Sequence, residues 1–266
     1  MSVSVSVFKI NLALLTLFLL QACGDIPRDN LLDPKNEESY TQPVVLLEAF
    51  VNFACPGEYS RWAVQSLQNV EQTYPGRVLV AEYHRDLAGY DDAYVSGPSS
   101  SKFTSIQDVY IDDQLPERGV PDVFVNGSVQ RVSGASSAVS VGEQITPSVD
   151  NLLAQKDYFL LQASVALTTE ADTTCNVSCR VARLGNKTNK NLKMRVIIIR
   201  DEKQDLLHHR VLDVSLLQPI ETLQAGEYLD VKFDPIVLSD IPTSVIVALF
   251  ASDGKTALQA VQEEIK

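Results

Sequence analysis

The sequence has few cysteines, one tryptophan and no run of basic residues. Four cysteines in 266 residues are too few for a small scaffold held together by disulfides. The 22 Lys and Arg are outnumbered by 34 Asp and Glu, which gives a formal net charge of −12. Without a basic face to contact phosphates, we expect no nucleic-acid partner. The remaining composition, 45% hydrophobic and 21% charged, is that of a globular protein with room for roughly two domains.

The first 23 residues predict export. Lys9 is the only charge before residue 23, and it precedes an apolar run over residues 10–20 of the length found in secretory signal peptides. A membrane-spanning helix would need about 20 apolar residues. The run ends in Leu20-Gln21-Ala22-Cys23, which resembles the lipobox of bacterial lipoproteins.

That resemblance implies that residues 1–22 are a signal peptide and that Cys23 is lipidated as the first residue of the mature protein. Each buried methylene contributes about 0.8 kcal/mol, so several acyl chains would hold the protein stably at a membrane. The alternative is a plain signal peptide whose cleavage leaves Cys23 as an incidental cysteine. Export also allows the other cysteines to form disulfides.

The chain after Cys23 falls into a tether and two further regions. Residues 23–42 are rich in Asp, Asn, Pro and Glu, a composition that predicts a flexible tether. Residues 43–157 begin with a strand, a helix and a strand, an order that predicts a βαβ unit with parallel pairing. Residues 86–117 look like a loop-rich insertion. A hairpin turning at Asn126-Gly127 and a closing helix follow. The predicted elements of this region are strands 44–51 and 78–83, helix 59–74, hairpin 121–132 and helix 141–157.

Residues 158–266 show a different pattern, with short alternating strands separated by turns. Six or seven strands over this length predict an antiparallel sandwich of immunoglobulin-like type. The candidate strands are 160–167, 175–182, 192–200, 209–216, 227–233 and 245–250.

Several motifs of residues 43–157 resemble a known fold. Cys55-Pro56-Gly57-Glu58 opens the first helix, and Gly119-Val120-Pro121-Asp122 precedes an apolar strand. Both resemble parts of the thioredoxin fold, its active-site turn and its cis-proline strand. With the lipobox, the tether and the appended strands, the chain from Cys23 to Lys266 resembles the thioredoxin-like outer-membrane lipoprotein family. The resemblance implies an α/β plus all-β chain, with a thioredoxin-like domain followed by an immunoglobulin-like β-sandwich domain and a cis Pro121.

The expected site consists of Cys55, Glu58 and Pro121, without a cofactor. Thioredoxin chemistry needs two thiols three residues apart at a helix N-terminus. Here either Cys55 matches the first cysteine with Glu58 in place of the second, or it matches the second with Asn52 in place of the first. Both alignments leave one thiol, and a nearby Glu58 carboxylate would raise its pKa.

We therefore expect a lipid-anchored cell-envelope protein with a degenerate site and a role in binding or assembly. The resemblance places it at the outer membrane, on the periplasmic or the surface face, with envelope proteins as partners. The alternative is a disulfide-exchange oxidoreductase that acts through Cys55, with a second thiol supplied from solution or by a partner.

Cys175 and Cys179 are the remaining cysteines. One local pair would leave Cys55 as the odd thiol, so we predict a disulfide between them. Because side chains four apart on a strand lie about 13 Å from each other, this bond requires a turn or bulge. A metal site is the rival interpretation, but no histidine is near in sequence, and no metal is expected.

Three histidines complete the candidates. His84 follows a predicted strand and could carry protons, although a solvated loop histidine is the simpler interpretation. His208 and His209 fit ordinary surface positions beside a strand.

Overall fold

The computed structural model describes residues 29–96, 99–111, 117–168, 173–202 and 208–265. The predicted signal peptide and the predicted lipidation site, Cys23, lie outside these residues. Within them there are three helices and thirteen strands, and the strands form two sheets. No helix in these described ranges is long and apolar enough to cross a membrane. The helices are α2 (Tyr59–Thr73), α3 (Ser99–Tyr110) and α4 (Ser140–Leu153). The strands are β1 (Val45–Val51), β2 (Val78–His84), β3 (Asp122–Val125), β4 (Gln130–Ser133), β5 (Phe159–Thr168), β6 (Thr173–Arg183), β7 (Asn189–Arg200), β8 (Arg210–Val214), β9 (Gln218–Leu223), β10 (Tyr228–Lys232), β11 (Ile236–Leu238), β12 (Ser244–Phe250) and β13 (Ala257–Glu264).

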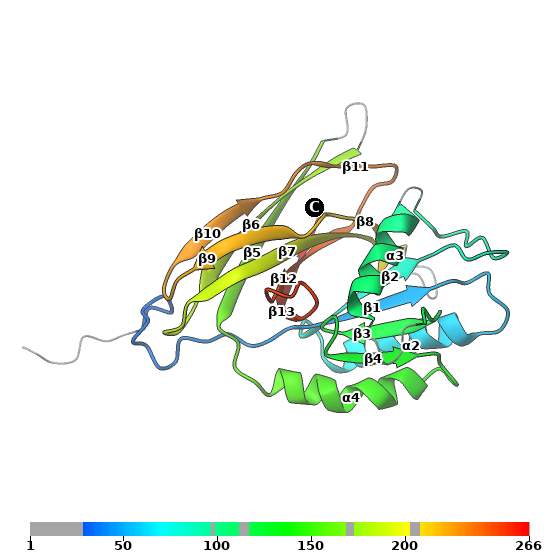
Figure 1. The fold of residues 1–266 in the computed structure, drawn as a ribbon, viewed down its shortest axis with the longest axis horizontal. Helices are drawn as coiled ribbons and strands as arrows, with labels where there is room; N and C mark the ends of the chain where they lie inside the picture. Colours follow the sequence, from blue (N-terminus) through cyan, green and yellow to red (C-terminus); the bar gives the residue numbers. More distant parts are fainter. Residues whose placement is uncertain (1–28, 97–98, 112–116, 169–172, 203–207, 266) are drawn as a thin grey trace, which may run out of the picture.

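A nine-stranded sheet runs through most of the molecule (Figure 1). Its order is β13-β12-β7-β8-β2-β1-β3-β4, and β9 also pairs with β7. The join between the early and the late strands is a parallel contact of β2 with β8, at Glu82 and Arg210. The other four strands form a second sheet in which β5, β10 and β11 all pair with β6.

The predicted fold class is therefore wrong. The chain is mainly β and is not a thioredoxin-like domain followed by a separate immunoglobulin-like sandwich. Strands from both sides of residue 158 share one sheet, and only four strands remain for the second sheet. The β7 and β12 runs are buried on both faces, as β1 and β2 are, which is typical of central strands with layers on each side.

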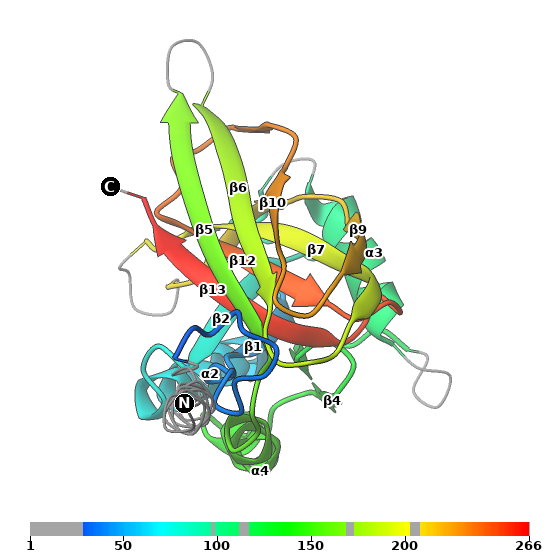
Figure 2. The same ribbon diagram turned by 90° about the vertical axis from the view of Figure 1, so that its left-hand side faces the viewer.

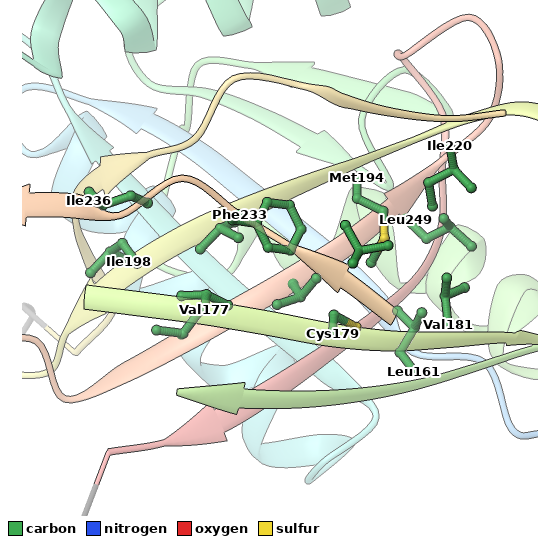
Figure 3. Packing of buried hydrophobic residues seen from close by; sticks show 14 of the residues in the cluster. Leu161, Val177, Cys179, Val181, Met194, Ile198, Ile220, Phe233, Ile236 and Leu249 are labelled. Carbon is green, nitrogen blue, oxygen red and sulfur yellow. The ribbon is translucent and has the colours of Figure 1, made fainter. Parts of the chain in front are cut away.

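Alternate side chains of β7 and β12 enter two different cores. One set, which includes Val196 and Val247, faces the four-stranded sheet. The other set, which includes Ile197 and Ile246, faces α3 and the aromatic residues of β1 to β3. We call the first core the sandwich core; Figure 3 shows side chains from both sheets meeting in it. Its central members include Leu161, Val177, Cys179, Val181, Met194, Ile198, Ile220, Phe233, Ile236 and Leu249.

Helices cover both faces of the β1–β4 end of the large sheet. We call β1 to β4 with α2, α3 and α4 the helix-covered part. Helices α2 and α4 pack on one face, through residues such as Leu67 and Ile145, and α3 packs on the other through Phe103 and Ile106. The prediction of a loop-rich insertion over residues 86–117 is thus wrong for residues 99–110, because a Ser-rich segment forms α3.

The predicted hairpin and the cis proline are confirmed. The chain turns between β3 and β4 over the four residues 126–129, and Asn126 and Gly127 have the positive φ angles of 43° and 66° that these two residue types adopt most readily. A Cβ on Gly127 would overlap the carbonyl of Lys255, so only glycine fits there. The Val120–Pro121 peptide bond is cis, and Pro121 is buried directly before β3.

The described part of the predicted tether is folded against the four-stranded sheet. Thr41 pairs with Asp157, and its hydroxyl donates to the Phe159 carbonyl at 3.0 Å. The Ser39 side chain is buried and accepts from the Gly185 N–H at 3.2 Å. The composition that predicted flexibility instead supplies turns, in which Asn and Asp side chains accept from the backbone two residues on. These acceptors are Asn30, Asp33 and Asn36.

Candidate functional site

The loop that carries Cys55 is fastened by the buried side chain of Asn52. Its amide donates to the carbonyls of Arg85 and Tyr90 at 2.7 and 2.9 Å. Its oxygen accepts from the N–H groups of Ala54 and Cys55, both at 2.8 Å. The end of β1 is thereby tied to the chain that leaves β2, and the position of the thiol is set by backbone contacts.

A buried His84–Asp92 pair supports the same loop. His84 Nδ1 lies 2.9 Å from Asp92 Oδ2, which also accepts from the Phe53 N–H at 2.9 Å. Burial alone would raise the pKa of Asp92, but the hydrogen bonds from His84, Phe53 and Tyr94 hold it below its usual range. The His84 side chain is fully buried, and its ring meets Phe53 edge-on with the centroids 4.8 Å apart. The interpretation of His84 as a solvated loop histidine is therefore wrong.

The Cys55 thiol is partly buried and less acidic than a free cysteine. Burial raises its pKa, and the Asp92 carboxylate raises it further. Cys55 lies four residues before the start of α2 at Tyr59, so it is outside the first turn, where the helix dipole acts most strongly on a thiolate. Glu58 is exposed and lies 3.8 Å from Arg61. The carboxylate that acts on the thiol is Asp92, which sequence spacing did not indicate.

Pro121 lies at the same end of the sheet as this loop. The pairing of Phe50 with Asp122 puts Pro121 beside the end of β1, the strand that leads to Cys55. Its neighbour Asp122 is fully buried, and Arg131 donates to both of its carboxylate oxygens at 2.8 Å. The structure thus brings the strands of Cys55 and Pro121 together, with a buried ion pair next to the proline.

The predicted Cys175–Cys179 disulfide is absent. Both thiols are free and buried, and both side chains point into the sandwich core from β6. The ten-residue pairing of β5 with β6 is continuous across them, so the turn or bulge that the bond requires does not occur. Burial raises the pKa of Cys175 to about 11 and that of Cys179 to about 12, and both act as packing residues.

A second cluster of ionisable groups lies where α2 meets the join between β2 and β8. His209 Nε2 is 2.8 Å from Glu71 Oε2, and Glu82 is fully buried on β2. Burial raises the pKa of Glu82 to about 8, with the charge of His209 acting against this rise and that of Glu71 adding to it. Burial alone would lower the pKa of His209, but the hydrogen bond and charge of Glu71 raise it. The interpretation of His209 as an ordinary surface histidine is therefore wrong, because its ring is largely buried and bonded to Glu71.

Two adjoining cavities open beside this cluster, with volumes of about 470 and 340 Å³. Asp201, His209, Gln262 and Glu264 line both of them. In the described ranges, no three His, Cys, Asp or Glu side chains are arranged to hold a metal ion. The charges of His209 and Glu82 influence each other's pKa, so the protonation states of these two groups are coupled. No sequence motif marks this cluster, because its members come from α2, β2 and the residues around β8 and β13.

A third polar network links β1 to β7 inside the molecule. The Tyr83 hydroxyl donates to Glu48 Oε1 at 2.8 Å, and Arg195 Nη1 donates to the Tyr110 hydroxyl at 2.8 Å. Burial raises the pKa of Glu48, and the charge of Arg195 opposes that rise. Glu48 and Arg195 are both almost wholly buried, so their charges compensate each other across the large sheet.

Fold and site together define a β-rich protein with two sheets and one partly exposed thiol among its described cysteines. A scan against models of protein families finds no match, and a search of curated proteins finds no significant match. Among solved structures, HBP35 of Porphyromonas gingivalis aligns with a TM-score of 0.59 and 15% identity, over 84% of this chain and 76% of that chain. A protein from Agrobacterium tumefaciens aligns with a TM-score of 0.49 and 19% identity, over 85% of this chain and 98% of that chain. The likeness to HBP35 concerns the fold alone. Because the alignment covers 84% of this chain, it includes residues on both sides of residue 158.

Proposed function

We propose that this chain is a lipid-anchored protein of the bacterial cell envelope whose folded part binds a partner and does not exchange disulfides. The observation that carries the second statement is the setting of Cys55, which is partly buried and near the Asp92 carboxylate, both of which raise the pKa of its thiol. Disulfide exchange requires the thiolate, and a raised pKa lowers the thiolate fraction at neutral pH. The environment of Cys55 is the opposite of the electropositive setting in which reactive thiols are found.

A second thiol for the exchange cycle is also missing from the described loop. The other described cysteines, Cys175 and Cys179, are buried in the sandwich core. A mixed disulfide at Cys55 would therefore need a thiol from outside the folded part to resolve it. These observations disfavour the oxidoreductase alternative and favour a binding role.

The anchor rests on the sequence around Cys23. Residues from Asn30 onward form turns and pack against the four-stranded sheet, so only seven residue steps separate Cys23 from the first of these turns. Fully extended, they span at most about 25 Å. A lipidated Cys23 would hold the folded part close to the bilayer.

Two single-cysteine variants test the two statements and serve as controls for each other. In cell fractionation, we expect Cys23→Ser to leave the membrane fraction and Cys55→Ser to remain there. Mass spectrometry of the full chain should find acyl groups on Cys23. A Cys23→Ser protein that stays at the membrane contradicts the anchor.

Insulin reduction tests the binding role separately. We expect the full chain and its Cys55→Ser variant to show the same background rate. A robust activity that disappears in Cys55→Ser would contradict the role in binding and restore the oxidoreductase alternative.

A further inference from the structure

A group of exposed apolar side chains lies at the end of the molecule where the described chain begins. Its members, which we call the tyrosine end, are Leu31, Tyr40, Tyr158 and Tyr228. We propose that the tyrosine end docks onto the lipid bilayer, with the three rings at the level of the lipid headgroups. The proposal rests on the lipid anchor of the proposed function and adds the face by which the folded part meets the membrane.

Backbone pairing brings two of the tyrosines together. Thr41 pairs antiparallel with Asp157, so Tyr40 and Tyr158 occupy the next opposed positions in register. The ring of Tyr158 also lies against Gly185, in the turn between β6 and β7. Figure 2, in which this end faces the viewer, shows the N-terminal segment in blue beside the start of β5.

The other two residues adjoin this pair. The carbonyl of Leu31 accepts from the hydroxyl of Ser39, and the carbonyl of Leu32 is in close contact with Gly226. Tyr228 follows two residues later, at the start of β10. In Figure 1 the blue segment and the turn before β10 lie toward the left, whereas α2 begins toward the right. The four exposed side chains therefore gather at one end of the longest axis.

A cation lies against the ring of each tyrosine. The charged group is 4.1 Å from the ring centroid for Lys156 on Tyr40, 5.3 Å for Arg183 on Tyr158 and 4.5 Å for Arg180 on Tyr228. Tyrosine is enriched at membrane–water interfaces, because its ring is apolar and its hydroxyl remains in contact with water and headgroups. Long basic side chains suit the same depth, since their stems are apolar and their charges reach water.

Charge attraction is not the basis of this docking. The exposed carboxylates of Asp29, Glu37 and Glu38 lie in the same N-terminal segment, and the full chain has a net charge of −12. An anionic surface would repel such a protein. The contact therefore relies on the rings and on Leu31, and we expect it on zwitterionic lipid and at high salt, where charge interactions are screened.

The length of chain before the first turn identifies the bilayer as the occupant. Seven residue steps separate Cys23 from Asn30, and fully extended they span at most about 25 Å. Any membrane that holds the acyl chains of Cys23 therefore lies close to the tyrosine end. So short a link also makes the contact intramolecular, and a weak affinity of the rings for lipid then suffices to orient the folded part.

Fluorescence quenching tests the contact on the lipidated full chain in phosphatidylcholine vesicles that contain a spin-labelled phosphatidylcholine. In a Cys55→Ser background, a fluorophore is attached at Asn186→Cys, in the turn that contacts Tyr158, or at the exposed position of Glu58→Cys, just before α2. The other described thiols, Cys175 and Cys179, are buried. We expect quenching by the spin-labelled lipid to be at least threefold stronger at residue 186 than at residue 58, with and without high salt.

Matched pairs of substitutions show whether the tyrosines produce this orientation. We expect Tyr40→Ser with Tyr228→Ser to reduce the quenching at residue 186 at least twofold. The control pair is Tyr90→Ser with Tyr59→Ser, which should leave it unchanged. Tyr40 and Tyr90 are 37% and 40% exposed, and Tyr228 and Tyr59 are 54% and 52% exposed, so the two pairs remove similar apolar surface.

The possible failures are distinguishable. Cys23 without acyl groups in mass spectrometry overturns the anchor and the docking with it. A lipidated chain with equal quenching at the two positions, or with quenching that is lost at high salt, overturns the docking alone. If Tyr40→Ser with Tyr228→Ser leaves the quenching unchanged but abolishes a crosslink to a second copy or to another protein, the tyrosine end binds that partner and the docking is wrong.

Discussion

The sandwich core and the helix-covered part are stabilised by different chemistry, although one sheet runs through both. The sandwich core contains apolar side chains and two buried thiols. The helix-covered part buries Glu48, Glu82, His84 and Asp122 among its packing residues. A lost contact in the first region leaves a cavity, whereas a lost partner in the second leaves a buried charge. Buried carboxylates and a buried histidine therefore make the helix-covered part sensitive to pH, whereas the side chains of the sandwich core, apart from its two thiols, carry no ionisable group.

The largest effect should come from removing Arg195 of β7, whose positive charge acts on the buried Glu48 in the helix-covered part. We expect Arg195→Leu to lower the free energy of unfolding by about 3–5 kcal/mol, because it leaves Glu48 buried without a compensating charge. Denaturant unfolding at neutral pH measures this loss.

A matched control is Arg180→Leu, which breaks an exposed pair with Asp230 and should leave the unfolding midpoint unchanged. Adding Glu48→Gln to Arg195→Leu should recover part of the loss. If Arg195→Leu and Arg180→Leu lower the free energy of unfolding equally, the claim that Arg195 compensates the charge of Glu48 is wrong.

The next effect is a pH dependence carried by Glu82. Its pKa is raised by burial to about 8 in the folded protein, above the value of about 4.3 for an unfolded chain. Between these values the folded state holds a proton that the unfolded state has released. The stabilising contribution of Glu82 is therefore fully present at low pH. Between the two pKa values, the free energy of unfolding falls by up to about 1.4 kcal/mol for each unit of rising pH.

We expect Glu82→Gln to remove this slope between pH 5 and 8, as measured by denaturant unfolding across the pH range. The same charge change at the exposed Glu58 is the control for a general loss of charge. Identical slopes in the wild type and in Glu82→Gln would contradict the account of the helix-covered part.

The smallest effect belongs to the sandwich core. Ile198 is fully buried there, and Ile198→Val removes one methylene group, which costs about 1 kcal/mol. Because no charge is involved, the loss should be the same at pH 5 and pH 8. A loss that changes with pH would show that the two regions are not separate in their chemistry.

Local patterns in the sequence predicted the elements of the helix-covered part better than the way they assemble. The apolar runs of β1 and β2, the amphipathic α2 and the Asn126-Gly127 turn are local signals, and each element is present. The shared sheet depends on the contact between Glu82 and Arg210, which are 128 positions apart and which no local pattern connects. One signal for the shared sheet was available. The continuous apolar run of β12 resembles that of β1 and is typical of a central strand with layers on both faces.

The candidate site shows the same division. Cys55 and the cis Pro121 were identified from the sequence, and the structure puts their strands side by side. Asp92, which raises the pKa of the thiol, comes from a loop 37 positions later. Its role depends on how that loop folds back over β1, so no spacing rule could reveal it.

The pKa of the Cys55 thiol tests the central claim most directly. It can be measured from the rate of iodoacetamide alkylation against pH, with the modified residue identified by mass spectrometry. The account predicts a value above that of a free cysteine, about 8.5, together with no alkylation of Cys175 or Cys179 until the protein unfolds. A Cys55 pKa below 7 would contradict the account, because the thiol would then be activated for exchange.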